Sequence, residues 1–176
     1  MKLLQNQAAL ARFAPGAIEA LTEAATNATF YAAPLTSEQI AANKRVVAMS
    51  ARVCEEAAAS VDHCFIAAFI DSRFAGFVVA ARHATHGHEL DWLMVHPDFH
   101  GSPVSRALMD AGLDWLGRDK PIWLTVIQFN ARAIRFYEKF GFAVDRDTKT
   151  AHTVPHHIMR RPAEASWPAP PSTSSG

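Results

Sequence analysis

The pattern of hydrophobic and polar residues divides the chain into a helical first third and a later region of short apolar runs. Residues 16–27 and 37–59 are rich in alanine and other helix-forming residues. The second segment opens with Thr36-Ser37-Glu38-Gln39, which supplies a hydroxyl for the N-cap and an acid for the first turn. We therefore expect two helices before the first long strand.

Three apolar runs follow, each of the length of a β-strand. Residues 63–70 and 74–82 are rich in Phe, Val and Ile and are separated only by Asp71-Ser72-Arg73, which predicts an antiparallel hairpin. A polar loop leads into the third run, residues 89–95. Pro97 ends this strand, because proline has no N–H for a strand ladder and restricts the residue before it.

The next stretch predicts a strand–helix–strand unit. Ser102 can cap a helix whose first position is Pro103, a favourable position for proline. Residues 122–127 form a continuous apolar run, which predicts a strand buried on both faces and joined to the third strand by a right-handed parallel crossover. The side of the helix expected to be buried comprises Val104, Ala107, Leu108, Ala111 and Trp115, and the opposite side carries Arg106, Asp110 and Asp114.

The end of the chain predicts one more helix and two closing strands. Asn130 begins the helix, and Gly141 lies where the end of a helix favours a positive φ. Residues 142–144 and about 156–161 can supply the closing strands. Residues 162–176 are rich in proline and serine and show no periodicity, so we expect a disordered tail.

Size and composition suit one globular domain over residues 1–161. The chain has 176 residues, of which 49% are hydrophobic, and a formal net charge of zero. This balanced charge argues against a general binder of nucleic acid or anionic membranes, which would carry a basic face. We expect the two cysteines, Cys54 and Cys64, to be reduced in a cytoplasmic protein. We find neither a signal-peptide pattern nor a run of the roughly 18 apolar residues that span a membrane.

Two segments carry patterns that are more specific than the order of elements. One, from Leu93 to Leu108, reads Leu-Met-Val-His-Pro-Asp-Phe-His-Gly-Ser-Pro-Val-Ser-Arg-Ala-Leu, and the other, from Asn130 to Phe142, reads Asn-Ala-Arg-Ala-Ile-Arg-Phe-Tyr-Glu-Lys-Phe-Gly-Phe. Together they resemble the GNAT superfamily of N-acetyltransferases. The first is similar to the family's strand, pyrophosphate loop and helix, and the second to its Asn and Phe-Tyr-x-x-x-Gly-Phe helix.

The resemblance implies an α/β fold with a mixed, mostly antiparallel sheet, a parallel strand–helix–strand crossover and flanking helices. It implies an acetyltransferase that moves an acetyl group from the co-substrate acetyl-CoA to an amine, either a small molecule or an amino group of a protein. We expect a monomer or homodimer without metal, nucleic-acid or membrane partners. The residues expected to bind the coenzyme are Leu93, Met94, Val95, His100, Gly101, Ser102, Val104, Ser105, Arg106, Asn130 and Phe136.

The loop in the first segment has a physical reason to bind a pyrophosphate. A loop that enters a helix presents unpaired N–H groups and the positive end of the helix dipole to an anion, and the candidate amides belong to residues 101–106. Pro103 and Ser105 replace both small residues of the family's loop, and Pro103 has no N–H. The hydroxyls of Ser102 and Ser105 can substitute, and His100 can assist. The alternative is an ordinary capped helix after a tight turn.

Acetyl transfer to an ammonium group requires a base, an oxyanion donor and an acid. Asp91 is our first candidate for the base and Glu89 the second, and strand alternation puts both on the face of Leu93 and Val95. By resemblance, the N–H of Val95, at a bulged strand edge, binds the developing oxyanion. Tyr137 would protonate the departing thiolate.

Each candidate also has a purely structural interpretation. Tyr137 can belong to the buried stripe of its helix, and either carboxylate can be solvated at a strand end. Asn130 can hold the pantetheine arm, cap the helix, or do both. For the whole protein, the alternative to an enzyme is a module that binds acyl-CoA without turnover, as a sensor or partner-binding domain.

Zinc binding is a further alternative, because His83, His86 and His88 lie close together and His156 and His157 are adjacent. No cysteine or carboxylate completes a zinc pattern, and adjacent residues of a strand point to opposite faces. We therefore expect no metal. The identity of the amine stays open, and the N-terminal helices, the loop after the hairpin and the last strands would determine it.

Overall fold

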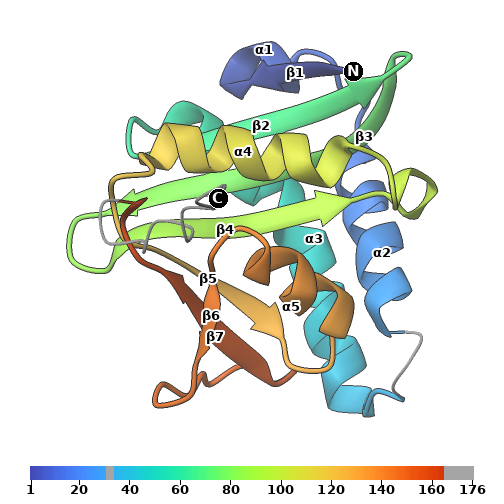
Figure 1. The fold of residues 1–176 in the computed structure, drawn as a ribbon. Coiled ribbons are helices and arrows are strands. Elements are labelled where there is room, and N and C mark those ends of the chain that lie inside the picture. The colour runs from blue at the N-terminus through green and yellow to red at the C-terminus, as the bar shows by residue number, and fades with distance from the viewer. Residues whose placement is uncertain (31–33, 165–176) are drawn as a thin grey trace, which may run out of the picture.

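The fold is built around one mixed β-sheet. The computed structural model describes residues 1–30 and 34–164. These residues form a seven-stranded sheet in the order β1-β2-β3-β4-β5-β7-β6, in which β4 and β5 are parallel (Figure 1). The strands are β1 (Lys2–Gln5), β2 (His63–Ile70), β3 (Arg73–His83), β4 (Gly87–Val95), β5 (Ile122–Ile127), β6 (Ala143–Asp145) and β7 (His156–Arg161).

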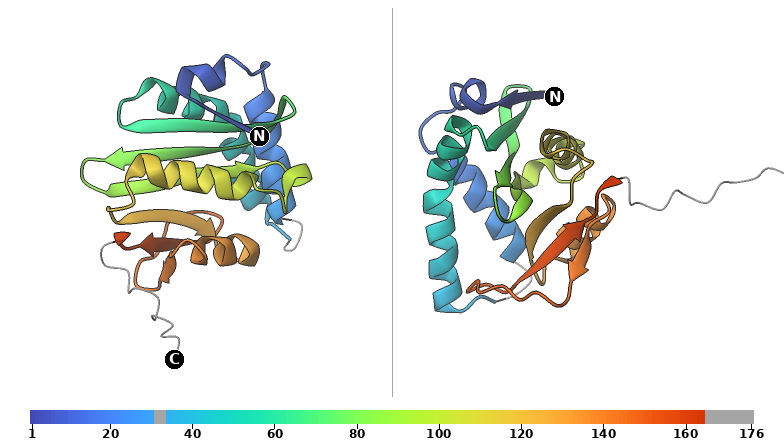
Figure 2. Two further views of the ribbon diagram at one scale, coloured as in Figure 1. Left: turned by 45° about the horizontal axis from the view of Figure 1, so that its top comes forward. Right: turned by 90° about the vertical axis from the view of Figure 1, so that its left-hand side faces the viewer.

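Helices cover both faces of this sheet (Figure 2). One face carries α1 (Asn6–Leu10), α2 (Ala17–Phe30) and α3 (Ser37–Ala59), and the other carries α4 (Val104–Leu116) and α5 (Ala131–Glu138). A short 3-10 helix, η1 (Pro97–Phe99), follows β4. Within the described ranges, no helix combines the length and apolar character needed to cross a membrane. The expected α/β architecture with a β4–α4–β5 crossover is confirmed.

Most elements expected from the hydrophobic pattern are present, and several begin and end as predicted. The Thr36 hydroxyl accepts a hydrogen bond from the Gln39 N–H, and the Gln39 side chain accepts one from the Thr36 N–H, which forms a capping box at α3. Gly141 has a φ of 86° after α5, as expected. The hydrophobic pattern did not predict β1 and α1, because Lys2–Gln5 is too short to show a period.

The start of α4 differs from the prediction by one residue. Pro103 is the N-cap residue rather than the first helical residue, and it makes no side-chain cap. The Ser102 hydroxyl instead accepts a hydrogen bond from the Val104 N–H at 3.3 Å. Ser102 therefore supports the turn before the helix from outside it.

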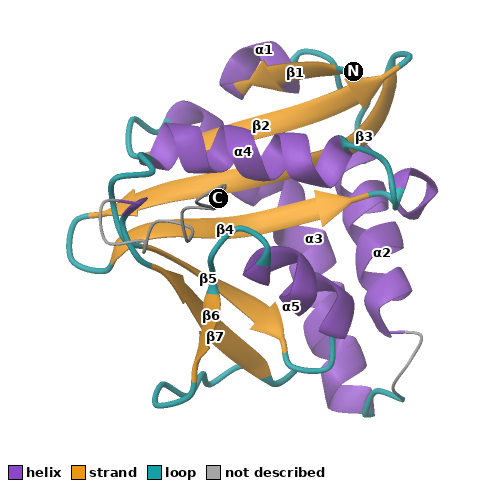
Figure 3. Cartoon of the chain, viewed as in Figure 1, coloured by secondary structure: helices purple, strands orange, loops and turns teal. Residues whose placement is uncertain are grey.

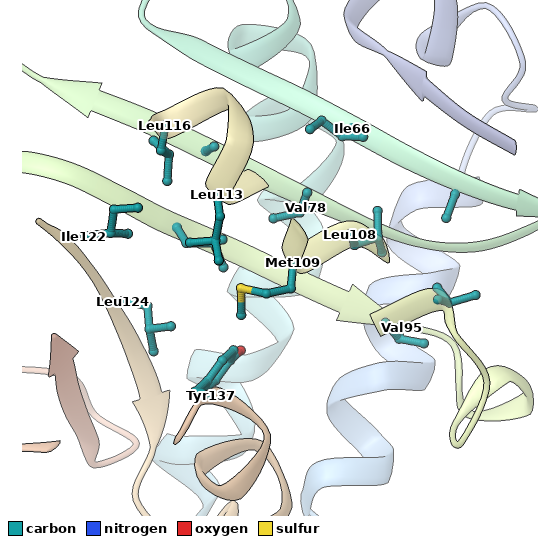
Figure 4. Close-up of a cluster of buried hydrophobic side chains, with 14 of the residues drawn as sticks. Ile66, Val78, Val95, Leu108, Met109, Leu113, Leu116, Ile122, Leu124 and Tyr137 are labelled. Carbon is teal, nitrogen blue, oxygen red and sulfur yellow. The ribbon is translucent and has the colours of Figure 1, made fainter. Parts of the chain in front are cut away.

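The buried side of α4 is also rotated from the predicted one. Ala107, Ala111 and Trp115 are only partly buried, and the helix instead packs along a stripe that includes Gly112. A Cβ at Gly112 would lie 3.0 Å from Leu90 Cδ1, so glycine allows α4 to lie close to β4. The buried residues of this stripe, several of which are labelled in Figure 4, are Val104, Leu108, Met109, Gly112, Leu113 and Leu116.

Strand β5 is buried on one face only, so the expectation of two buried faces is wrong. Ile122, Leu124 and Val126 pack in the cluster that contains α4 and α5, while the alternate residues are partly exposed. The physical reason is that α2 and α3 lie against β2, β3 and β4 rather than against β5. The second face of β5 therefore stays accessible.

Strand β4 contains a β-bulge. Trp92 pairs with Val79 and Leu90 pairs with Ala80, so Asp91 is an extra residue that no residue of β3 opposes. β4 also pairs with β5 only near its start, and the two strands then separate (Figure 3).

The bulge decides which face the side chains of β4 occupy. Leu93 and Val95 pack in the α4 cluster, whereas Trp92 packs in the cluster of α1–α3. Asp91 lies on the α3 side, since its charge acts on the buried thiol of Cys54. The expectation that Asp91 shares a face with Leu93 and Val95 is therefore wrong, because the extra residue breaks the strict alternation of the strand.

Candidate active site

A cleft of about 640 Å³ opens where β4 and β5 separate. It extends from residues of α2 and α3 on one side of the sheet to the start of α4 and α5 on the other. Glu89 and Val104 do not line this cleft, and Val104 is fully buried in the core. The other predicted site residues all line it: Asp91, Leu93, Met94, Val95, His100, Gly101, Ser102, Ser105, Arg106, Asn130, Phe136 and Tyr137.

The loop before α4 presents backbone donors to one end of the cleft. Among the described residues, the N–H groups of Gly101, Ser105 and Arg106 have no hydrogen-bond acceptor. Gly101 adopts a φ of 81°, which glycine tolerates without strain. Unpaired N–H groups at the start of a helix of this length form a suitable site for an anion.

The remaining groups of the loop are already engaged. The Ser102 hydroxyl donates to the Phe99 carbonyl at 2.6 Å, so it is not free to donate to a phosphate. The Ser102 N–H also donates to Phe99, at 3.2 Å, and Pro103 has no N–H. The Ser105 hydroxyl has no partner among the described residues and is the hydroxyl that can replace the missing donor.

Cationic side chains surround the same end of the cleft. Arg132 Nη1 lies 2.9 Å from His100 Nδ1, and burial together with the Arg132 charge lowers the pKa of His100. Arg106, Arg135 and Lys139 also line this end. Of these residues, only Arg106 and His100 were predicted from the sequence. The available signal was the spacing of 132, 135 and 139, which places three cations on one side of α5.

Helix α5 holds the polar groups of the cleft in place. The Asn130 side chain accepts a hydrogen bond from the Ala133 N–H at 3.1 Å and so caps α5, as expected. Asn130 also lines the cleft, which leaves its amide N–H₂ group available to a ligand. Phe136 packs against Tyr137 and Phe140, with ring centroids 5.6 and 5.1 Å apart. These contacts hold the Tyr137 side chain in place.

Tyr137 is buried and also borders the cleft. Its side chain is 8% exposed and belongs to the cluster drawn in Figure 4, while its hydroxyl has no hydrogen-bond partner among the described residues. Burial raises the pKa of the phenol to about 12. The hydroxyl therefore keeps its proton over the physiological range and is available there as a hydrogen-bond donor. The packing and catalytic interpretations of Tyr137 are compatible, because the ring packs while the hydroxyl faces the cleft.

Asp91 lies at the opposite end of the cleft from the cations. Burial and the nearby charge of Glu89 raise the pKa of Asp91 to about 7, while His83 and a hydrogen bond from Trp92 act in the other direction. A carboxyl group with this pKa exists in both protonation states at neutral pH. Such a group is suited to accept a proton and release it again.

Glu89 lies outside the cleft in a separate histidine contact. Its Oε2 is 2.5 Å from His83 Nε2, and its side chain is nearly buried. Burial raises the pKa of Glu89, and the hydrogen bond and charge of His83 oppose this effect. The geometry therefore favours Asp91 over Glu89 as the group that contacts an acceptor. No group of histidine, cysteine and acidic residues in the described ranges is arranged to hold a metal ion.

The N–H of Val95 is directed into the gap between the two parallel strands. The His96 N–H donates to the Ala75 carbonyl of β3 at 2.9 Å. Because successive N–H groups of a strand alternate in direction, the Val95 N–H points away from β3, toward the region where β5 is no longer paired. The bulge that was expected at Val95 lies at Asp91.

Fold and cleft together have the form of an acyltransferase of the GNAT class. Residues 20–142 match the family model for the acetyltransferase (GNAT) family, and the chain belongs to this family.

Similar sequences and structures agree with this assignment. An uncharacterized N-acetyltransferase of Mycobacterium tuberculosis is 37% identical over 91 residues, which span 49% of this chain and 56% of the relative, about half the length of each. The PaiA N-acetyltransferase of Thermoplasma acidophilum, solved with coenzyme A, is 19% identical with a TM-score of 0.66 over 92% of this chain and 99% of that chain. A GCN5-related N-acetyltransferase of Rhodopseudomonas palustris gives 20% identity and 0.65 over 92% and 94%. These structures share the fold.

Proposed function

We propose that the chain transfers an acetyl group from acetyl-CoA directly to an amine, which is a small molecule or an amino group of a protein. One observation carries the proposal: a single cleft is lined both by unpaired N–H groups and cations at the start of a helix and by a carboxyl group whose pKa is about 7. The residues of the cation-rich end fit the phosphates of the coenzyme, because they combine free N–H groups with several positive charges. The pantetheine arm would extend along the open edges of β4 and β5.

Asp91 is the proposed base. An alkylammonium has a pKa of about 10.4, so it must lose a proton before its nitrogen can attack the thioester. Asp91 in its ionised form would take this proton directly or through one water molecule. Glu89 is the second candidate. Its carboxyl group contacts His83, and its charge raises the pKa of Asp91, so its proposed role is indirect.

The Val95 N–H and Tyr137 are proposed to stabilise the charges that develop next. The amine nitrogen forms a bond to the acetyl carbon, and the negative charge that moves to the carbonyl oxygen would be stabilised by the Val95 N–H. When the C–S bond breaks, the electron pair goes to sulfur and Tyr137 would supply the proton. The acylated nitrogen would release its second proton to water, and the Tyr137 phenolate would regain one from water. A thiol has a pKa of about 8.5, so proton transfer from a phenol with a pKa of about 12 is uphill and its contribution should be modest.

The proposed reaction forms no covalent intermediate with a cysteine of the enzyme. Cys54 and Cys64 are buried, and burial raises the pKa of both thiols, so neither forms a thiolate readily. Neither cysteine lines the cleft. Direct transfer within one complex of both substrates is therefore the proposed route.

A second candidate function is an acyl-CoA sensor without turnover. It is favoured by Pro103, which removes a donor from the loop, and by Ser102, whose hydroxyl is occupied. Calorimetry with acetyl-CoA and a thiol-release assay with a panel of amines separate the two functions. Binding with amine-dependent thiol release supports the enzyme, binding alone supports the sensor, and no binding by folded protein refutes both.

A further inference from the structure

The end of the cleft around Asp91 differs in character from the coenzyme end. It is lined by Asp91 and Trp92 of β4, by Thr26 and Thr29 of α2, and by His156 at the start of β7. Ala25, Val46 and His152 complete this end. We call this set of residues the acceptor pocket, because it lies on the far side of the Val95 N–H from the coenzyme loop.

The polar groups of the acceptor pocket present hydrogen-bond acceptors to a ligand. The Thr26 hydroxyl donates to the Thr22 carbonyl at 2.9 Å and accepts from Asn43 Nδ2 at 3.3 Å. The Thr29 hydroxyl donates to the Ala25 carbonyl at 3.2 Å. Each hydroxyl proton is therefore used within α2, and each oxygen offers only its remaining lone pairs to the cleft.

His156 and Asp91 follow the same pattern. His156 Nδ1 lies 2.6 Å from the Val154 carbonyl, which can only accept, so Nδ1 carries the proton. Burial is the main cause that lowers the pKa of His156, so the ring is neutral at neutral pH and Nε2 is an acceptor. The indole N–H of Trp92 is engaged with Asp91, which leaves the ring faces of Trp92 for contact.

The charges of the cleft are separated in the same way. Among the described residues that line it, Asp91 is the only one with a carboxyl group, and the Arg and Lys residues all belong to α4, to α5 or to the C-cap of α5. A ligand in the acceptor pocket therefore meets the carboxyl group of Asp91, hydroxyl oxygens and aromatic rings, and no Arg or Lys side chain that could pair with an anion. A carboxylate bound here would lose water, would find no guanidinium or ammonium group of Arg or Lys, and would face Asp91.

We propose that the acceptor is a primary amine that carries no carboxylate beside its amino group, and that the acceptor pocket rejects α-amino acids. This inference rests on the proposed acetyl transfer and specifies its substrate class. The ammonium is bound by Asp91 and the neutral acceptors, and an apolar or aromatic body packs on Trp92 and Val46.

Two matched series of amines test this inference. They are 2-phenylethylamine, phenylalaninamide and phenylalanine, and ethylamine, alaninamide and alanine. Thiol release from acetyl-CoA is measured with each, and kcat/KM is expressed per unprotonated amine so that the amines are compared at equal nucleophile concentration. We expect the carboxylate member of a series to react at least about 10-fold more slowly than both neutral members.

The outcomes distinguish this inference from the proposed function. If an amino acid reacts as fast as its amide, acetyl transfer stands and the substrate class is wrong. If acetyl-CoA binds in calorimetry but none of the six amines releases thiol, the inference that the acceptor pocket takes primary amines of this kind is wrong. If acetyl-CoA does not bind to the folded protein, both the proposed function and this inference are refuted.

A variant with an added cation provides a second, independent readout. Thr29→Arg would place a guanidinium in the acceptor pocket, and we expect it to reduce the discrimination against the carboxylate by about 10-fold. Val61→Arg adds the same charge at an exposed residue outside the cleft and should leave the discrimination unchanged. Equal discrimination in both variants would overturn the inference. If Thr29→Arg does not fold, the ratio measured with the unmodified chain still decides.

Discussion

Replacement of Asp91 by asparagine should make the protein more stable at alkaline pH and less active at the same time. The carboxylate lies on a β-bulge, partly buried between α3 and the cleft, and its pKa is raised from 3.8 to about 7, chiefly by burial. In the folded protein the ionised form of Asp91 is therefore destabilised relative to the protonated form. An amide of the same shape removes this penalty and also removes the proposed base.

The sign of the stability effect follows from the direction of the pKa shift. The unfolded chain ionises Asp91 near 3.8 and the folded chain near 7, so between these values the folded state holds more protons. Stability should therefore fall as the pH rises through this window and stay constant above it. The full shift corresponds to about 4 kcal/mol, and solvent access to the partly exposed side chain reduces the expected gain to about 1 to 3 kcal/mol.

The assay is thermal unfolding of Asp91→Asn and the unmodified protein at about pH 5 and about pH 8. At about 2 to 4 °C per kcal/mol, the variant should melt several degrees higher at the alkaline pH, with a smaller difference at the acidic pH. Asp62→Asn, which removes an exposed carboxylate outside the cleft, is the matched control. An Asp91→Asn gain that does not grow with pH would refute the assigned environment of the carboxyl group.

Activity supplies the second half of this prediction. In the unmodified protein, kcat/KM should rise with pH through an inflection near 7, as Asp91 ionises. Asp91→Asn should lower kcat/KM by about 100-fold or more and remove this inflection. A variant that keeps both the rate and the pH profile would show that another group, such as Glu89, accepts the proton.

Three further perturbations follow from the geometry. Tyr137→Phe should leave the melting temperature within about 2 °C, because the lost hydroxyl has no partner in the described part of the chain, while kcat falls about 10- to 100-fold; unchanged thiol release would refute its role as the acid. The double variant Arg132→Gln with Arg135→Gln should weaken acetyl-CoA binding in calorimetry by about 10-fold or more and reduce the salt dependence of the affinity. An unaltered affinity would show that these two arginines do not bind the coenzyme. Gly76→Ala should destabilise the fold by about 1 to 3 kcal/mol in urea unfolding, since its Cβ would lie 2.6 Å from the Met94 carbonyl oxygen; stability equal to that of the unmodified protein would contradict this contact.

The hydrophobic pattern predicted those parts of the fold that depend on local periodicity. The helix at 37–59 has an uninterrupted period and its own capping residues, and the hairpin of β2 and β3 joins two long apolar runs through a short turn. The second motif also located Asn130, Phe136 and Tyr137 in one helix beside the cleft. Each of these features arises from residues near one another in the chain.

The features that the sequence did not predict depend on contacts between distant segments. Residues 89–95 read as a regular strand, and the bulge at Asp91 becomes visible only through the pairing with β3. Arg132, Arg135 and Lys139 resemble an ordinary solvated helix surface until α5 is placed beside the loop before α4. The contact between Glu89 and His83 joins two strands and could not be distinguished from a solvated strand end.

The extra residue in β4 also puts the proposed base and the proposed coenzyme loop on opposite sides of the sheet. Because Asp91 faces α2 and α3 while the coenzyme loop leads into α4, acceptor and coenzyme can approach from different directions and meet only in the gap between β4 and β5. A chain that lacks Asp91 should regain the regular alternation of the strand and would carry no carboxylate in the acceptor pocket. It would keep the free N–H groups of Ser105 and Arg106 and the cations of α5. If Asp91 is the base, loss of its single codon should therefore leave a protein that binds acetyl-CoA without transferring the acetyl group.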